Sequence, residues 1–179
     1  MTRSNSIFLF IFALLLMVVH SSCKTNSDEG KVVPEIKGTQ AYKPTAKDIE
    51  NIEYVEYALS DAAENATKDW VKFQELLIQI EALKRADLSF FKDDKAILQA
   101  FITDLKNEIP EALNESSVIV RLVALETILY KFEGTANLYD VKKSALLSGI
   151  AEVLVGHTNL IFQINKMLEK EAQNIQKPN

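Results

Sequence analysis

The chain has only one cysteine, Cys23, and it lacks the alternating polar and apolar pattern of β-strands. A single cysteine can form neither an intramolecular disulfide nor a cysteine zinc site. Glycine-rich phosphate loops and the HExxH, GxSxG and CxxCH motifs are also absent from the sequence. We therefore expect an all-α protein without a cofactor, and we do not expect an enzyme.

Acidic residues outnumber basic residues by 25 to 20, which gives a formal net charge of −5. A surface of this sign repels phosphate backbones, so nucleic acid is not an expected partner. Of the 179 residues, 47% are hydrophobic. That share predicts one domain with a substantial core instead of a disordered chain.

The N-terminal segment resembles a bacterial lipoprotein signal. Arg3 precedes an apolar run from Ile7 to Val19, which is shorter than the about 20 residues of a membrane-spanning helix. The small residues Ser21 and Ser22 stand directly before Cys23. The resemblance implies that Cys23 becomes the first residue of the mature protein and carries acyl chains that anchor it in a membrane.

Two features beside the cysteine bear on this signal. His20 occupies the position where such signals usually have Leu, although the signals of Bacteroidetes lipoproteins are looser. Ser27-Asp28-Glu29 resembles the acidic run of surface-displayed lipoproteins. We expect an outer-membrane lipoprotein that faces the periplasm or the outside. The alternative is an ordinary secretory signal, cut after Ser21, that leaves Cys23 as a free thiol.

Residues 24–44 contain two glycines and two prolines without an apolar period, as in an extended linker. The sequence thus predicts four parts of the chain. These are a signal peptide at 1–22, acylated Cys23 with a flexible linker at 23–44, a helical bundle at 45–175 and a tail at 176–179.

Apolar residues at helical spacing follow the linker. Thr45 is a candidate N-cap with Asp48 at the N3 position. From Thr45 to Ala86 there is neither proline nor glycine. We expect one long helix over this range, or two helices separated near Asn65-Ala66-Thr67.

Two shorter helices are expected next. One runs from Asp94 to Glu108 and stops before Pro110, which disfavours helical geometry at the preceding residue. The other spans Ser116 to Phe132 and is so apolar that we expect neighbours to cover most of its sides. Gly134 fits the end of this helix, and Asn137 fits the cap of the following one.

The last helix is expected from Leu138 to about Asn174, with Gly149 and Gly156 on one face. We interpret the two glycines as a groove for a bulky side chain such as Trp70 or Phe101, and the alternative is a break near Gly156. The predicted architecture is an antiparallel up-and-down bundle of about four helices, of which the first and last are long.

Arg121 is the most informative polar residue, because helical spacing places it beside Leu125 and Phe132 in the apolar arc. A buried charge must be paired. One interpretation is an arginine that binds an anionic ligand in a pocket. The other is a buried ion pair with a helix carboxylate, for which the candidates are Asp61, Asp104, Glu108 and Glu152.

His157 lies in the apolar seam of the last helix. As a metal or haem ligand it is a weak candidate, because Glu152 precedes it by five residues, not the three of di-iron sites. We expect a core histidine with a satisfied hydrogen bond and no metal site.

Three short segments resemble small helical lipoproteins of flavobacteria, a group without an established activity. They are Pro110-Glu111-Ala112-Leu113, Ile119-Val120-Arg121-Leu122 and Leu125-Glu126-Thr127. The resemblance implies a lipoprotein and supplies no functional residue.

The sequence therefore favours a non-enzymatic, lipid-anchored helical module of the cell envelope. Its expected partners are the membrane, through the lipid on Cys23, and another envelope protein. The alternative is a ligand-binding bundle with Arg121 in a pocket for an anionic small molecule. The oligomeric state is left open.

Overall fold

The computed structural model describes residues 42–173, and every regular element in that range is a helix. The all-α class is therefore confirmed. The elements are α2 (Ala46–Glu50), α3 (Asp61–Thr67), α4 (Val71–Lys84), α5 (Ser89–Lys92), α6 (Lys95–Asn107), the 3₁₀-helix η2 (Glu111–Leu113), α7 (Ser116–Ala136) and α8 (Lys143–Ala172).

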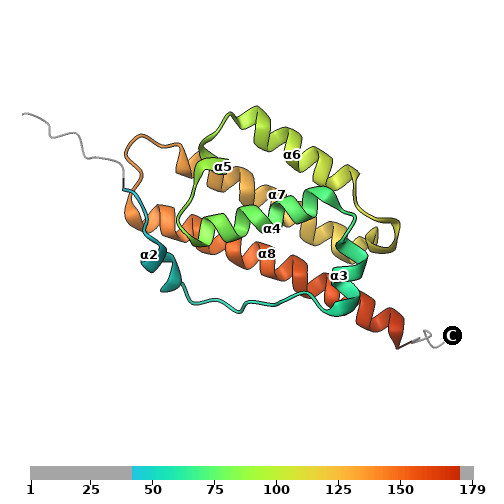
Figure 1. Ribbon diagram of the computed structural model, residues 1–179. Coiled ribbons are helices and arrows are strands. Elements are labelled where there is room, and N and C mark those ends of the chain that lie inside the picture. The colour runs from blue at the N-terminus through green and yellow to red at the C-terminus, as the bar shows by residue number, and fades with distance from the viewer. Residues whose placement is uncertain (1–41, 174–179) are drawn as a thin grey trace, which may run out of the picture. The chain divides into compact units, whose positions relative to one another are not determined.

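Four of these helices, α4, α6, α7 and α8, form the body of the domain. Each packs on two others, since α4 contacts α6 and α8, and α7 contacts α6 and α8. Consecutive members run in opposite directions (Figure 1). Short connections between them, such as α5 and η2, make neighbours in sequence neighbours in space. The shorter α2 and α3 lie against α8.

The core lies between these four helices. Its largest fully buried side chains are Trp70, Phe73, Phe91 and Phe132. Trp70 stacks on Phe73 with 4.9 Å between ring centroids, and Phe91 meets the edge of Phe132 at 4.8 Å. The Nε1–H of Trp70 donates to the backbone oxygen of Leu105 at 2.9 Å, so the indole is buried without losing its hydrogen bond.

The predicted long first helix is wrong. Thr45 and Asp48 do form the expected capping box, but the helix that it begins, α2, ends at Glu50. Residues 52–60 are not helical and lead to α3, and we call this segment the strap. Figure 1 shows the strap running along α8 from α2 to α3. Ile52, Tyr54 and Leu59 of the strap pack against the core.

The bounds of the two shorter helices lie closer to those predicted from the sequence. Asp94 caps α6 by accepting a hydrogen bond from the backbone N–H of Ala96 at 2.9 Å, and α6 ends before Pro110 as expected. The next helix, α7, begins at Ser116 and runs to Ala136, so that Gly134 lies inside it. Asn137 caps the end of α7 and not the start of α8.

The last helix, α8, is continuous through 30 residues, which excludes a break near Gly156. The glycine groove is present, but its occupants come from α7. A Cβ at Gly149 would lie 2.7 Å from Phe132 Cδ2, and one at Gly156 would lie 2.8 Å from Ile128 Cδ1. The expected contact with Trp70 or Phe101 is therefore wrong.

Among residues 42–173, α8 alone is long and apolar enough to meet the criteria of a membrane span. Core helices of folded domains meet the same criteria, and α8 contacts α2, α3, α4 and α7. Its apolar seam, which includes Leu146, Ile150, Leu160 and Ile164, is buried in these contacts.

Candidate functional site

The strap is bound to α8 through two polar side chains of that helix. Thr158 Oγ1 accepts a hydrogen bond from the backbone N–H of Tyr57 at 2.8 Å. Asn165 donates from Nδ2 to the backbone oxygen of Ala58 at 2.8 Å and accepts from the N–H of Ser60 at 2.9 Å. These bonds satisfy backbone groups of a segment that has no helix or sheet to pair with.

A cluster of ionisable side chains lies where the strap, α4 and α8 meet. Lys84, at the end of α4, forms ion pairs with Glu56 of the strap and with Glu81. The hydroxyl of Tyr54 donates to Glu56 Oε2 at 3.2 Å. Partial burial alone would lower the pKa of Lys84, but the hydrogen bonds to both glutamates outweigh it and raise the pKa to about 12. Lys84 is thus a stable cation that holds the strap to α4.

His157 belongs to the same cluster and occupies the seam position that the sequence predicts. Its Nε2 atom is buried and finds no hydrogen-bond partner among the described residues. The expectation of a satisfied core histidine is therefore wrong. Burial, reinforced by the positive charge of Lys84, lowers the pKa of His157 from 6.5 to about 4. The imidazole is consequently neutral at pH 7.

A metal at this cluster would require several converging ligands. Within the described part of the chain, no group of three or more His, Cys, Asp and Glu side chains is placed to hold a metal ion. His157 is accompanied by glutamates that are already paired with Lys84. The cluster joins the strap to α4 beside α8.

The surroundings of Arg121 match neither the ligand pocket nor the buried ion pair that the sequence suggests. The residue is exposed, and it forms no ion pair with any carboxylate in the described range. Glu152, one of the proposed partners, is bound by Lys131 at 2.6 Å instead. Three cavities lie at the surface of the described domain, one of them beside Lys170. Arg121 lines none of the three. The buried ion pair is wrong because the buried arc of α7 is narrower than predicted.

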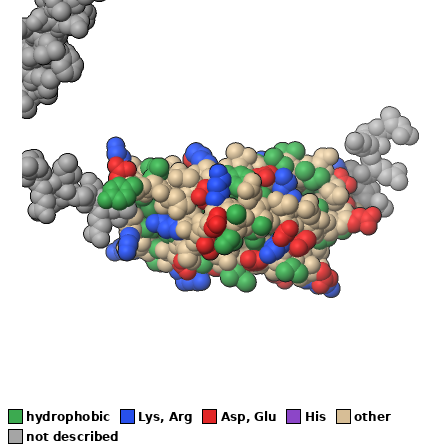
Figure 2. All heavy atoms as spheres, turned by 90° about the horizontal axis from the view of Figure 1, so that it is seen from above, with side chains coloured by type: hydrophobic (Ala, Val, Ile, Leu, Met, Phe, Trp, Pro, Cys, Tyr) green, Lys and Arg blue, Asp and Glu red, His purple; other side chains and the backbone are tan. Residues whose placement is uncertain are grey.

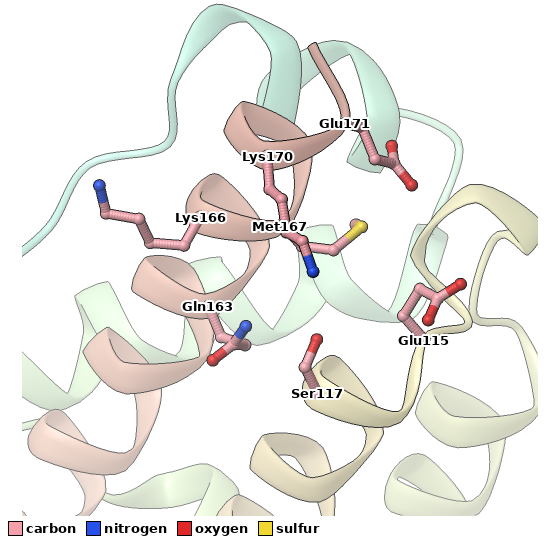
Figure 3. A pocket seen from close by; sticks show the side chains of 7 residues that line it. All are labelled: Glu115, Ser117, Gln163, Lys166, Met167, Lys170 and Glu171. Carbon is pink, nitrogen blue, oxygen red and sulfur yellow. The ribbon is translucent and has the colours of Figure 1, made fainter. Parts of the chain in front are cut away.

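The largest of these cavities, of about 610 Å³, lies between the start of α7 and the end of α8. Lys170 and Met167 point into it, whereas Lys166 points away (Figure 3). Its other lining residues are Glu115, Ser117, Gln163 and Glu171. Lys166 is paired with Glu169 outside the cavity, and Glu115 and Glu171 accompany Lys170 at its wall, so the lining is not positively charged as an anion site would be.

The first half of α7 leaves three aliphatic side chains in water. The exposed fractions of Ile119, Val120 and Val123 are 38%, 63% and 44%. We call these three residues the α7 patch. A cavity of about 220 Å³ adjoins it, lined by Ile109 and Leu122 among others. The expectation that neighbours cover most of this helix is wrong, because α5, α6 and α8 leave the side of Ile119, Val120 and Val123 exposed.

Elsewhere the surface mixes both signs of charge with single apolar side chains, as Figure 2 shows for one face. Thr158 and Asn165, the residues that bind the strap, are not among the residues predicted from the sequence. Their signal is weak, because they are two of several polar residues of α8, and only their spacing of seven positions places them together. Two such positions lie on one face, and a buried polar side chain needs a partner.

The predicted lipidation site, Cys23, lies outside the described residues, as do the signal peptide and most of the linker. Comparison with family models, with curated proteins and with solved structures finds no significant match to this chain.

Proposed function

We propose that this chain is a lipid-anchored module of the cell envelope that binds another envelope protein and performs no catalysis. The observation that carries the proposal is the position of Cys23, directly after an apolar run of signal-peptide length and two small residues. Acylation at this cysteine would attach the helical domain to a membrane by a linker of about 20 residues, long enough to span some tens of Å.

The α7 patch supports a protein partner for the domain. Aliphatic side chains that stand side by side in water are typical of interaction surfaces more than of solvent-facing helices. Val120 is exposed by 63%, and the adjoining cavity beside Ile119 offers a recess for a partner's side chain. The patch is small, which suits a reversible contact between proteins held in the same membrane.

Leu138 and Tyr139 support a location close to the membrane. They are exposed by 55% and 85% in the turn between α7 and α8. The described chain begins at Tyr42 close to the same end of the domain, since Lys143 Nζ lies 5.1 Å from the Tyr42 ring centroid. A tyrosine and a leucine at the end where the chain from the anchor enters the domain would be accommodated in the interfacial region of a bilayer.

The anchor can be tested on the single cysteine of the chain. Cells that produce the full chain are supplied with a labelled fatty acid, and the intact mass of the isolated protein is measured. We expect label, and a mass that corresponds to a chain beginning at Cys23 with acyl groups. Cys23→Ala should lose the label and the membrane fraction together.

The secretory alternative has its own signature in the same sample. A chain cut after Ser21 retains a free Cys23 thiol that reacts with maleimide, and it carries no label. Because there is no second cysteine, a reactive thiol can come from Cys23 alone. A soluble, unlabelled and maleimide-reactive protein would refute the anchor.

A further inference from the structure

The strap lies at one edge of the domain, where Ile52, Tyr54 and Leu59 are only partly buried against the core and the ring of Tyr57 contacts that of Phe162. Its backbone bonds run to Thr158 and Asn165, and its one ion pair with α4 runs from Glu56 to Lys84. Val55, in the middle of the strap, is exposed by 64%. By contrast, the side chains that hold α4, α6, α7 and α8 together are fully buried. The strap can therefore separate from α8 at much lower free energy than the core can open.

His157 lies at the site where this separation would begin. Three charged side chains act on it: Glu56 from the strap, and Glu81 and Lys84 from α4. Tyr54 of the strap is hydrogen-bonded to Glu56. None of them accepts a hydrogen bond from its buried Nε2. A proton on that nitrogen would be a buried donor without an acceptor, on a cation next to Lys84.

The closed strap thus tolerates only a neutral imidazole, whereas an imidazole in water accepts a proton freely. We propose that His157 is a proton-operated latch, in which protonation in mildly acidic solution releases residues 52–60 from α8 while the core of α4, α6, α7 and α8 stays folded. The latch depends on the described domain only and does not rest on the lipid anchor.

The pH window follows from the two states of His157. With the strap closed, burial and then Lys84 lower the pKa of His157 to about 4, and in the released state it returns toward its ordinary 6.5. The released state therefore binds the proton more strongly. Its population rises as the pH falls from 6.5 to about 4 and levels off below that, by at most roughly 300-fold, because each unit of pKa difference gives a factor of ten.

Glu56, the strap carboxylate of the cluster, does not supply the same response. The hydrogen bond from Lys84 is the main cause that lowers the pKa of Glu56, so Glu56 stays charged through the upper part of this window. His157 is the single histidine between residues 42 and 173. Between pH 6.5 and 5 the response is consequently a property of His157.

Release would change what the domain presents to its surroundings. Thr158 and Asn165 would be free to bind the backbone of another extended segment. Their present hydrogen bonds are made to backbone groups of the strap and to none of its side chains. The strap would also add its own extended length, about 3.3 Å per residue, to the chain that precedes the domain.

Hydrogen–deuterium exchange of the full chain, followed by mass spectrometry, tests the latch. Exchange in residues 52–60 is measured between pH 7.5 and 4.5 and corrected for the intrinsic rate, and the fluorescence of buried Trp70 is recorded in parallel. We expect strap exchange to rise by at least tenfold between pH 7.5 and 5 while Trp70 emission stays constant. Unchanged strap exchange, or a simultaneous change at Trp70, would overturn the proposal.

Variants separate His157 from other acid effects. His157→Leu and His157→Gln cannot titrate, and in both the exchange of the strap should become independent of pH; a rise equal to that of the unmodified chain would refute the latch. Glu56→Gln, which keeps the histidine, should loosen the strap at every pH and keep the pH response. A nuclear magnetic resonance titration of His157 in the unmodified chain tests the latch without variants. A His157 pKa near 6.5, measured while the strap amides remain protected from exchange, would contradict the latch.

Discussion

Gly149 of α8 lies so close to the ring of Phe132 in α7 that a Cβ at Gly149 would stand 2.7 Å from Cδ2 of that ring. The ring is confined, because Phe132 is buried and also packs against Phe91, with 4.8 Å between the ring centroids. The absence of a side chain at Gly149 therefore sets how closely α7 and α8 approach.

Gly149→Ala should lower the free energy of unfolding. The forced shift of Phe132 costs about 1–3 kcal/mol, which exceeds the roughly 1 kcal/mol that alanine gains over glycine in a helix. Gly134→Ala is the matched control, since a Cβ there meets nothing within 4 Å, and this variant should be more stable than the unmodified chain. Urea unfolding followed by Trp70 fluorescence measures both. An equal gain from the two variants would show that the groove is not tight.

Trp70→Phe should destabilise the domain by about 2–4 kcal/mol. The indole Nε1–H donates to the oxygen of Leu105, in the last turn of α6, where helix carbonyls lack intrahelical partners. Phenylalanine leaves that oxygen unpaired and also leaves a cavity. Val71→Ala, at a neighbouring position that is 66% exposed, should change the stability by less than about 1 kcal/mol. Circular dichroism during thermal unfolding reports both variants, and similar midpoints for the two would contradict this role of the hydrogen bond.

Thr158→Val removes the acceptor of the Tyr57 N–H and keeps the shape of the side chain. We expect faster exchange of the strap amides at neutral pH, by about five- to tenfold, which corresponds to the roughly 1 kcal/mol of one hydrogen bond. Thr127→Val is the control, because the Thr127 hydroxyl donates only to Val123 of its own helix. Hydrogen exchange at neutral pH should leave the strap of this control unchanged. Equal effects of the two variants would mean that Thr158 does not hold the strap.

Val120→Asp should abolish the capture of a partner by the α7 patch. A charge in the centre of an apolar contact must be desolvated, so cross-linking in native cells should lose its product while the thermal midpoint stays within a few degrees. Ile78→Asp places the same charge on α4, at a side chain exposed by 64%, and should leave the product in place. Loss of the product in both variants would argue against a specific role of the patch.

The helices that are bounded by local chemistry could be predicted from the sequence. Asp94 caps α6 and Pro110 follows its end, and both signals act within a few residues. The glycine groove was also predictable, since Gly149 and Gly156 share a face in any helix. Its occupants were not, because Phe132 and Ile128 reach the groove only through the way in which α7 packs on α8.

The strap shows where helical periodicity misleads. Ile52, Tyr54, Val55 and Tyr57 are β-branched or aromatic, types that lower helix propensity. Ile52, Val55 and Leu59 nevertheless have the spacing of a helical seam. The decision between the two conformations depends on Thr158, about a hundred positions away, which offers a partner to an extended backbone. The sequence of residues 52–60 alone does not show that Thr158 will be there to accept this hydrogen bond.

Arg121 and His157 illustrate the same limit at the level of single side chains. A helical wheel placed His157 correctly in the seam of α8, but it put Arg121 in the buried arc of α7. It could not show that α7 has neighbours on only part of its circumference, which leaves Arg121 in water. Nor could it show that the side chains around His157 would be engaged with Lys84, which leaves Nε2 without an acceptor.

The start of the domain is fastened to the beginning of α8 through Lys143. Lys143 pairs with Asp48 at 2.5 Å, and the Tyr42 hydroxyl donates to the same carboxylate at 2.6 Å. A mechanical load that enters the domain at Tyr42 therefore meets this clasp first. Only after the clasp yields would the load act on the strap, whose bonds lie along α8 and would share the force in shear. A force applied from the N-terminal side would therefore break the contacts of the domain in two successive stages.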